Sequence, residues 1–247
     1  DRVRDAGAGL ALGWLLALLL LRRLLAPAGR VPAEVTAAEA PPENAVDFVL
    51  RGGNQAAYDA REREILVEGP RGTGKTRTIL EKLHHLCIDH PGLHAGIFRK
   101  YQRTLAGTCL TTFNEQVISG GQGISFYGGS DSEPAAYRYR NGSRIVCLGL
   151  DDSEKTKSAE LDIAFINEAT EVTEADYEGL LPLLRHQVDG KRLIEAQRIY
   201  ADCNPADSGH WLNQRAERGQ TRRIRTQLRD NPAYYDDGGS LTEAGAA

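Results

Sequence analysis

The sequence has 247 residues, enough for one large α/β domain or two small ones, and its 41% hydrophobic and 26% charged content is ordinary for a soluble globular protein. A net charge of -4 argues against a protein that coats nucleic acid through its overall charge, but it allows a local basic patch. Four widely spaced cysteines without a C-x-x-C pair argue against a zinc site and a disulfide framework.

The first 44 residues differ in composition from the rest. Residues 6–21 form an uncharged apolar run, somewhat shorter than the roughly 20 residues that a membrane-spanning helix needs. Three interpretations stay open for it: a membrane anchor, a buried or interfacial helix, or a leader unrelated to the working domain. The anchor is less favoured than the other two together, because both length and flanking charges are marginal. Residues 27–44, rich in Pro, Ala and Glu, predict a linker, so the folded domain is expected to begin near Ala45.

A short glycine-rich stretch and a glutamine precede the first predicted strand. The Gln55 side chain offers a donor and an acceptor, which match the edge of adenine. A solvated loop glutamine is the alternative, and the position alone favours neither.

Residues 69–76 fit the phosphate-loop pattern G-x-x-x-x-G-K-[ST] at every fixed position. Glycines let successive backbone N–H groups point at one phosphate chain, the lysine brings a positive charge to the outer phosphates, and the threonine hydroxyl can ligate Mg²⁺. The predicted ATP-binding residues are Gly69, Pro70, Arg71, Gly72, Thr73, Gly74, Lys75 and Thr76. This pattern predicts a nucleotide phosphate site.

The surroundings of this loop have the order that such a site requires. Residues 64–68 predict a buried strand, and apolar residues recur at helical spacing from Ile79 to Cys87. Strand, glycine loop and helix therefore follow one another. His84, His85 and His90 lie near this helix, where a surface or capping role is expected rather than metal binding.

The middle of the chain predicts a strand at 94–99, a helix at 104–117 and a Gly- and Ser-rich loop at 119–132. Residues 136–140 and 143–148, joined by Asn-Gly, predict a β-hairpin. Its arginines alternate with tyrosines and can meet DNA phosphates, although a charged, solvated edge strand is at least as well supported. The arginines in question are Arg138, Arg140 and Arg144.

An apolar strand at 161–166 ends in Asn167 and Glu168. A carboxylate at such a strand tip can polarise the water that attacks a phosphate, and Glu168 fits this role. The residue before it can support Mg²⁺, which Asn167 does imperfectly because it brings a dipole instead of a negative charge.

Further along, a helix is predicted from Thr173, a strand at 197–202 and a short helix at 210–218. Asn204 follows that strand, where it can reach the γ-phosphate or simply cap a turn. Residues 221–225 predict a basic strand and a second set of candidate DNA-contacting side chains, Arg222, Arg223 and Arg225.

Taken in order, these segments resemble the ATPase domain of the bacteriophage terminase large subunit, over residues 52–232. The motifs that carry the resemblance are EGPRGTGKT at 68–76, FRK at 98–100, NGS at 141–143 with GLD at 149–151, NEATE at 167–171, DCNP at 202–205, HWL at 210–212 and DNP at 230–232.

The resemblance implies a three-layer α/β P-loop NTPase fold of the additional-strand, conserved-Glu type, with a mostly parallel sheet and an inserted β-hairpin. It implies ATP and Mg²⁺ as cofactors, with Gln55 reading adenine, Glu168 activating water, and Asn204 sensing the γ-phosphate. Lys157 stands where many such proteins carry an arginine that acts on a neighbouring subunit, and Arg71 competes for this role in cis. Thr76 and Asn167 are the implied metal-site residues.

The resemblance also implies a motor that packages double-stranded DNA into a procapsid in the host cytoplasm. Its implied partners are DNA, a portal protein, a small terminase subunit and further copies of the chain in a ring. Residues 1–44 are then leader and linker, 45–232 the ATPase domain, and 233–247 the start of a linker to an absent C-terminal nuclease domain. We therefore expect no DNA cleavage from this chain. Because it has no methionine and begins at Asp1, we expect it to be a fragment, or a stretch whose start is uncertain.

Two alternatives to the motor stay open. Asn167, where an acidic residue is more usual, and the absent nuclease domain motivate a nucleotide-binding switch or assembly module with little hydrolysis. The apolar run at 6–21 motivates a membrane-tethered ATPase, which is the weakest of the three.

Overall fold

The computed structural model describes residues 48–118, 123–151, 156 and 159–246, which belong to one compact unit, Glu39–Ala247. The leader predicted at 1–44 and Lys157 lie outside the described residues. Among the residues that are described, no helix is long and apolar enough to cross a membrane.

Eight strands form one sheet in the order β3-β4-β5-β2-β6-β7-β1-β8. β4 is antiparallel to β3 and β5, and the remaining neighbours are parallel. The strands are β1 (Glu64–Glu68), β2 (His94–Arg99), β3 (Ile124–Tyr127), β4 (Ala135–Tyr139), β5 (Arg144–Gly149), β6 (Ile163–Ile166), β7 (Arg198–Cys203) and β8 (Arg222–Arg225). The predicted α/β fold with a mostly parallel sheet and an inserted hairpin is confirmed.

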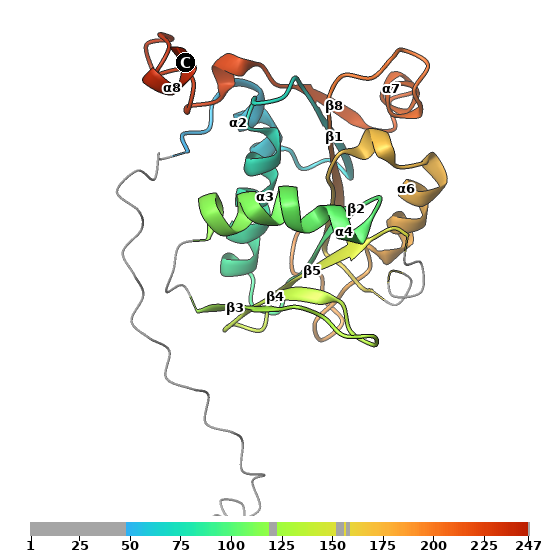
Figure 1. Ribbon diagram of the computed structural model, residues 1–247. Helices are drawn as coiled ribbons and strands as arrows, with labels where there is room; N and C mark the ends of the chain where they lie inside the picture. Colours follow the sequence, from blue (N-terminus) through green and yellow to red (C-terminus); the bar gives the residue numbers. More distant parts are fainter. Residues whose placement is uncertain (1–47, 119–122, 152–155, 157–158, 247) are drawn as a thin grey trace, which may run out of the picture. The chain divides into compact units, whose positions relative to one another are not determined.

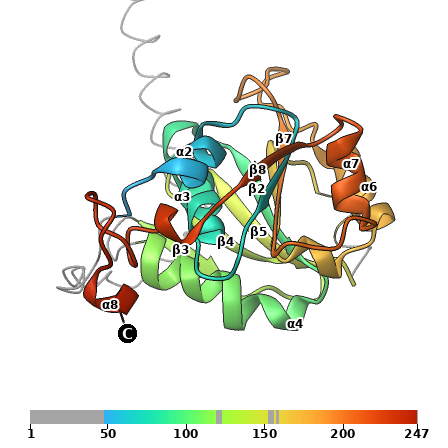
Figure 2. The same ribbon diagram turned by 90° about the horizontal axis from the view of Figure 1, so that it is seen from above.

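Helices cover both faces of this sheet, with α2 and α3 on one side and α6 and α7 on the other (Figures 1 and 2). The α-helices are α2 (Gly52–Asp59), α3 (Lys75–Asp89), α4 (Gln102–Leu105), α6 (Glu174–Leu180), α7 (Trp211–Glu217) and α8 (Glu243–Ala246). Side chains of β1 alternate between the two faces, as the pleat requires. Ile65 and Val67 pack in the cluster that contains residues of α2 and α3, and Leu66 packs in the cluster that contains residues of α6 and α7. The result is the three-layer arrangement that the resemblance implies.

Two predicted segments differ from the structure. The helix predicted at 104–117 begins earlier, in α4, and continues through two π-helical turns, Ala106–Leu110 and Phe113–Val117. The loop predicted at 119–132 contains β3, which pairs with β4. β3 has only four residues and none of them is buried, with Phe126 53% exposed, so it lacks the longer buried apolar run by which strands are found in a sequence.

The segment after residue 232 also contacts the domain. The Arg51 guanidinium, just before α2, donates to the carbonyl oxygens of Tyr235 (3.3 Å) and Asp236 (2.6 Å). The domain boundaries proposed from the sequence remain predictions.

Candidate nucleotide site

Three parallel strands bring their carboxyl ends together at one edge of the sheet. β7 lies between β1 and β6, and Cys203 at its end is level with Glu68, the last residue of β1. On the other side Ala201 is level with Ile166, the last residue of β6. The segments that follow β1, β6 and β7 therefore leave the sheet side by side. They contain the glycine loop, the Asn167-Glu168 pair and Asn204, respectively.

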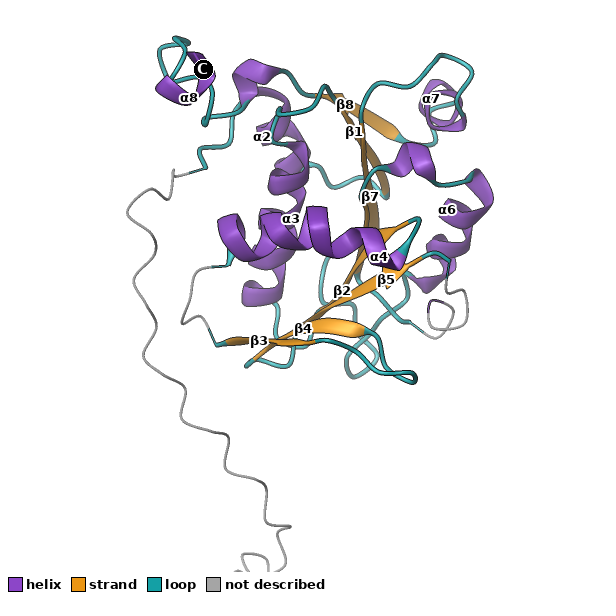
Figure 3. Ribbon diagram, viewed as in Figure 1, coloured by secondary structure: helices purple, strands orange, loops and turns teal. Residues whose placement is uncertain are grey.

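The glycine loop runs from β1 directly into α3 (Figure 3). Gly72 and Gly74 have φ angles of 84° and 87°, in the left-handed region that glycine adopts without a steric penalty. A Cβ atom on Gly69 would clash with Thr226 Oγ1, so a larger residue does not fit there. Gly74 is the N-cap of α3 and provides no side-chain cap, which leaves the first N–H groups of this helix available to an anion.

Lys75 connects the glycine loop to the segment after β7. Its side chain is largely buried, and Nζ donates to the carbonyl oxygen of Pro70 (3.2 Å) and to Oδ1 of Asn204 (3.1 Å). Lys75, which the sequence assigns to the outer phosphates, and Asn204, which it assigns to the γ-phosphate, are therefore in direct contact.

Asp202, the penultimate residue of β7, connects the other site residues. It is 1% exposed. Its carboxylate accepts hydrogen bonds from the Thr76 hydroxyl, from Nδ2 of Asn167 (3.0 and 3.2 Å to the two oxygens) and from the backbone N–H of Glu168 (2.8 Å). Burial raises the pKa of Asp202 to about 6, and the hydrogen bonds from Thr76 and from the Glu168 N–H act in the opposite direction.

Glu168 occupies a backbone conformation that is uncommon for a residue with a side chain. Its φ is 55°, in the left-handed region, and its side chain is partly exposed. The hydrogen bond from its N–H to Asp202 holds this turn. The sequence predicted the strand tip correctly but gave no sign of this backbone geometry.

The oxygen atoms at this edge fit a magnesium ion. Mg²⁺ prefers oxygen ligands and is bound in proteins by one or two carboxylates together with substrate phosphates. Thr76 and Asp202 provide a hydroxyl and a carboxylate in contact, and the buried Oδ1 of Asn167 has no hydrogen-bond partner. Within the described part of the chain, no group of three or more His, Cys, Asp or Glu side chains could hold a metal by itself. A metal at Thr76 therefore depends on phosphate oxygens as well.

The remaining predicted nucleotide residues lie less close to this network. Gln55 is exposed on α2 and its Nε2 donates to Asp59 on the same helix (2.7 Å). Arg71 is exposed in the glycine loop. The neighbour of Gln55, Asn54, is fully buried instead and donates to the carbonyl oxygen of Thr73 (2.8 Å). The structure thus assigns loop support to Asn54, a residue to which the sequence analysis gave no role.

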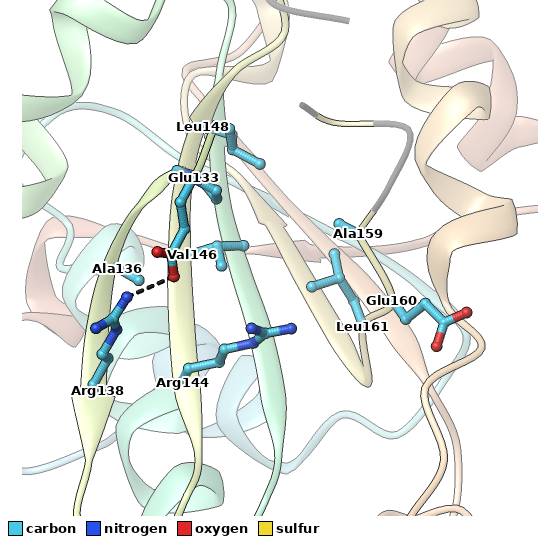
Figure 4. Close-up of a pocket in the computed structure, with 10 residues that line it drawn as sticks. Glu133, Ala136, Arg138, Arg144, Val146, Leu148, Ala159, Glu160 and Leu161 are labelled. Atoms are coloured by element: carbon cyan, nitrogen blue, oxygen red, sulfur yellow. Dashed lines mark hydrogen bonds and ion pairs between the residues drawn. The ribbon is translucent and has the colours of Figure 1, made fainter. Parts of the chain in front are cut away.

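Arg138 on β4 and Arg144 on β5 line a pocket (Figure 4). Arg138 pairs with Glu133 at 2.5 Å and lies over the ring of Tyr127, whereas Arg144 contacts the His94 ring at 3.3 Å. Arg140 is exposed at the end of the hairpin.

The β8 arginines lie close to acidic or polar side chains. Arg222 pairs with Glu62, and Arg225 pairs with Glu68 at 3.4 Å. Arg223 donates to Asn213 at 3.0 Å. Both sets of arginines remain predictions for DNA contact.

Sequence reasoning missed Asp202. Its signal was present, because it is the one acidic residue in the strand RIYADC, which is buried throughout, and it directly precedes Cys-Asn-Pro. A carboxylate in such a strand is costly unless it is bonded. The sequence analysis placed Asp202 at the end of a strand and in the DCNP motif but gave its side chain no role.

The fold and the site together define a P-loop NTPase in which an additional strand, β7, separates the phosphate-loop strand from the strand that ends in Glu168. The family profile of the phage terminase large subunit matches residues 61–238. The chain belongs to this family. A search of the curated proteins found no match.

Solved structures of large terminases are similar to this chain at the level of the fold. The large terminase of a thermophilic bacteriophage has a TM-score of 0.60 at 14% identity, covering 76% of this chain and 48% of that chain. The same phage protein in complex with ATP-gamma-S has a TM-score of 0.56 at 14% identity, covering 77% and 48%. The Thermus phage P74-26 large terminase ATPase domain has a TM-score of 0.45 at 12% identity, covering 68% and 84%. The present chain thus spans about half the length of the first of these proteins.

Proposed function

We propose that the chain is the ATP-hydrolysing motor domain of a phage terminase large subunit, which moves double-stranded DNA into a procapsid. The observation that supports this most is the convergence of Lys75, Asn204 and the Asp202–Glu168 contact at one edge of the sheet. Membership of the terminase family adds to it, since the matched residues include this whole edge.

The chemistry we propose is in-line attack of water on the γ-phosphate of ATP. Lys75 neutralises charge on the outer phosphates. The backbone N–H groups of residues 71–76 hold these phosphates. Glu168 orients the attacking water and accepts its proton. Mg²⁺, when bound at Thr76, supplies further neutralisation of the phosphate charge.

Asn204 is proposed to report on the γ-phosphate. Its Oδ1 accepts a hydrogen bond from Lys75, the residue that would contact the same phosphate. If Lys75 bonds to a phosphate instead, its hydrogen bond to Asn204 changes, and the segment after β7 can move in response. Such a contact suits the coupling of hydrolysis to movement.

The wider assignments are proposals of the same kind. Gln55 reads adenine, and Arg71 in cis or Lys157 in trans supplies an additional positive charge to the transition state. The partners are double-stranded DNA, a portal protein, a small terminase subunit and further copies of the chain in a ring. The site of action is the procapsid portal in the host cytoplasm.

A second candidate function is a nucleotide-binding switch with little hydrolysis. It is favoured by Asn167, which brings no negative charge to the end of β6. Both functions require ATP binding, and only the motor requires turnover.

Phosphate release by the full chain, with and without duplex DNA, tests the proposal. We expect steady release that DNA stimulates, and its loss in the variant Lys75→Ala, which removes the charge at the phosphates. Measurable ATP affinity without release would support the switch. Absence of ATP binding would contradict both functions.

A further inference from the structure

Asp202 is a buried carboxylate without a basic partner. The described residues form no ion pair with it, and its hydrogen-bond donors are a hydroxyl, an amide and a backbone N–H. Lys75 attracts it electrostatically, but the Lys75 ammonium bonds to Pro70 and Asn204 instead. Removing a carboxylate from water is costly unless its charge is compensated. The environment of Asp202 is therefore suited to a cation.

The Thr76 hydroxyl is placed to share such a cation. Thr76 Oγ1 donates its one proton to Asp202 Oδ2. A hydroxyl has one donor and two acceptor lone pairs, so this bond leaves both lone pairs for a metal or a water molecule. The same bond would persist with Thr76 as a ligand, and no rearrangement of the two side chains is needed.

Asn167 occupies the strand tip next to Asp202 but contributes no charge. Its Nδ2 donates to both oxygens of the Asp202 carboxylate, at 3.0 and 3.2 Å. Oδ1 of Asn167 is buried and has no partner. The amide therefore orients the neighbouring carboxylate, which an aspartate at position 167 could not do because two adjacent carboxylates repel each other.

We propose that Asp202, on β7, supplies the carboxylate that holds Mg²⁺ at Thr76, and that Asn167 positions this carboxylate. The acidic group of the metal site has thus moved from β6, where the terminase resemblance implies it, to the adjacent strand. This inference rests on the proposed nucleotide-binding function. It resolves the apparent defect at position 167 without requiring a loss of activity.

The test is the affinity of the full chain for ATPγS, measured by calorimetry with excess Mg²⁺ and again with EDTA. We expect Mg²⁺ to strengthen binding to the unmodified chain. In Asp202→Asn the gain from Mg²⁺ should fall about 10- to 100-fold, the range seen when groups that support a metal are removed. Metal-free affinity should stay close to that of the unmodified chain, which also shows that the variant is folded.

The double variant Asn167→Asp with Asp202→Asn exchanges the two side chains and should regain most of the dependence on Mg²⁺. Asp131→Asn removes the same charge from an exposed loop and serves as the matched control, with no expected change. The affinity for Mn²⁺ in the presence of ADP, measured by electron paramagnetic resonance, should be lowest for Asp202→Asn and largely restored in the double variant.

If Mg²⁺ strengthens ATPγS binding to Asp202→Asn as much as to the unmodified chain, the inference is overturned, but the proposed nucleotide site is not. The exchanged double variant could also keep its metal-free affinity for ATPγS without regaining the effect of Mg²⁺. This result would contradict the inference that a carboxylate on either strand can hold the metal. If the unmodified chain does not bind ATPγS under either condition, the proposed function itself is wrong.

Discussion

Arg215 on α7 shows how strongly one buried residue organises the side of the sheet away from α3. Its guanidinium bonds to Glu64 on β1 (2.9 Å) and to Glu174 and Glu178 on α6 (3.1 and 2.9 Å). It also lies over the ring of Tyr177. One side chain thus joins a strand and two helices.

We expect Arg215→Ala to lower the free energy of unfolding by about 3 kcal/mol, because the largely buried Glu64 carboxylate then loses its basic partner and keeps only the hydroxyl donors Tyr177 and Thr221. Arg218→Ala on the exposed end of the same helix should change it by less than about 0.5 kcal/mol. Urea unfolding of both variants measures the difference, and equal stabilities would contradict the role given to Arg215.

At the residue scale, the sequence was most informative where chemistry restricts the residue type. Gly72, Gly74 and Lys75 were predicted because a phosphate loop accepts few alternatives at these positions. The roles of Asp202 and Asn54 were not predicted, since each residue bonds to a partner more than 15 positions away in the chain. Asp202 bonds to Thr76, and Asn54 bonds to Thr73. No local pattern contains such contacts.

Among the elements, α3 and the hairpin meet through a histidine for which a surface or capping role was expected. His84 is 2% exposed, Nδ1 contacts the Tyr139 hydroxyl at 3.0 Å, and its ring packs edge-on against Phe113. Burial, with a smaller contribution from His85, lowers the pKa of His84 to about 4. The helical period placed this residue on α3 but did not reveal that a hairpin covers it.

This burial predicts how stability depends on pH. His84 takes up a proton near pH 6.5 when unfolded but only near pH 4 when folded. The stability that the neutral, buried His84 provides is therefore fully present above pH 6.5 and is lost as the pH falls toward 4. The slope from one such group is at most about 1.4 kcal/mol per pH unit.

Chemical unfolding at several pH values measures this slope. His84→Gln should have a shallower slope than the unmodified chain, whereas the exposed His85→Gln should retain most of it. An unchanged slope in His84→Gln would show that other groups carry the dependence. His94 is one contributor, because burial lowers its pKa to about 4 as well.

Strands with a buried apolar pattern were predicted well, and the one missed strand, β3, contains no buried residue. β1 and β2 have the same bounds in the sequence analysis and in the structure, because each is apolar and buried along most of its length. β3 was missed because its form depends on pairing with β4 and not on burial.

At the scale of the molecule, the two arginine sets lie near opposite edges of the sheet. The hairpin strands β4 and β5 are the second and third strands from one edge, and β8 is the other edge. The sequence alone does not predict how far apart the two arginine sets lie, because their positions depend on the order of the strands in the sheet. Arg140 and Arg144 bond to no acidic side chain in the region described here, whereas Arg222 and Arg225 do. The hairpin is therefore the better candidate for DNA phosphates.

We expect the double variant Arg140→Gln with Arg144→Gln to weaken duplex DNA binding and to reduce the slope of log affinity against log salt by about 2, near 0.9 for each lost phosphate contact. Arg222→Gln with Arg225→Gln is the matched control and should have a smaller effect. Titrations at several salt concentrations measure both. Binding that does not respond to salt would exclude both sets.

We propose that Glu168 activates water at the site formed by Lys75, Asn204 and Asp202, and phosphate release by Glu168→Gln tests this role. The substitution keeps size and hydrogen bonding but removes the base, so turnover should fall about 10²- to 10⁴-fold while ATP affinity is largely kept. Glu171→Gln, three residues further and bonded to Arg99, should remain active. Undiminished turnover in Glu168→Gln would show that Glu168 does not activate the attacking water.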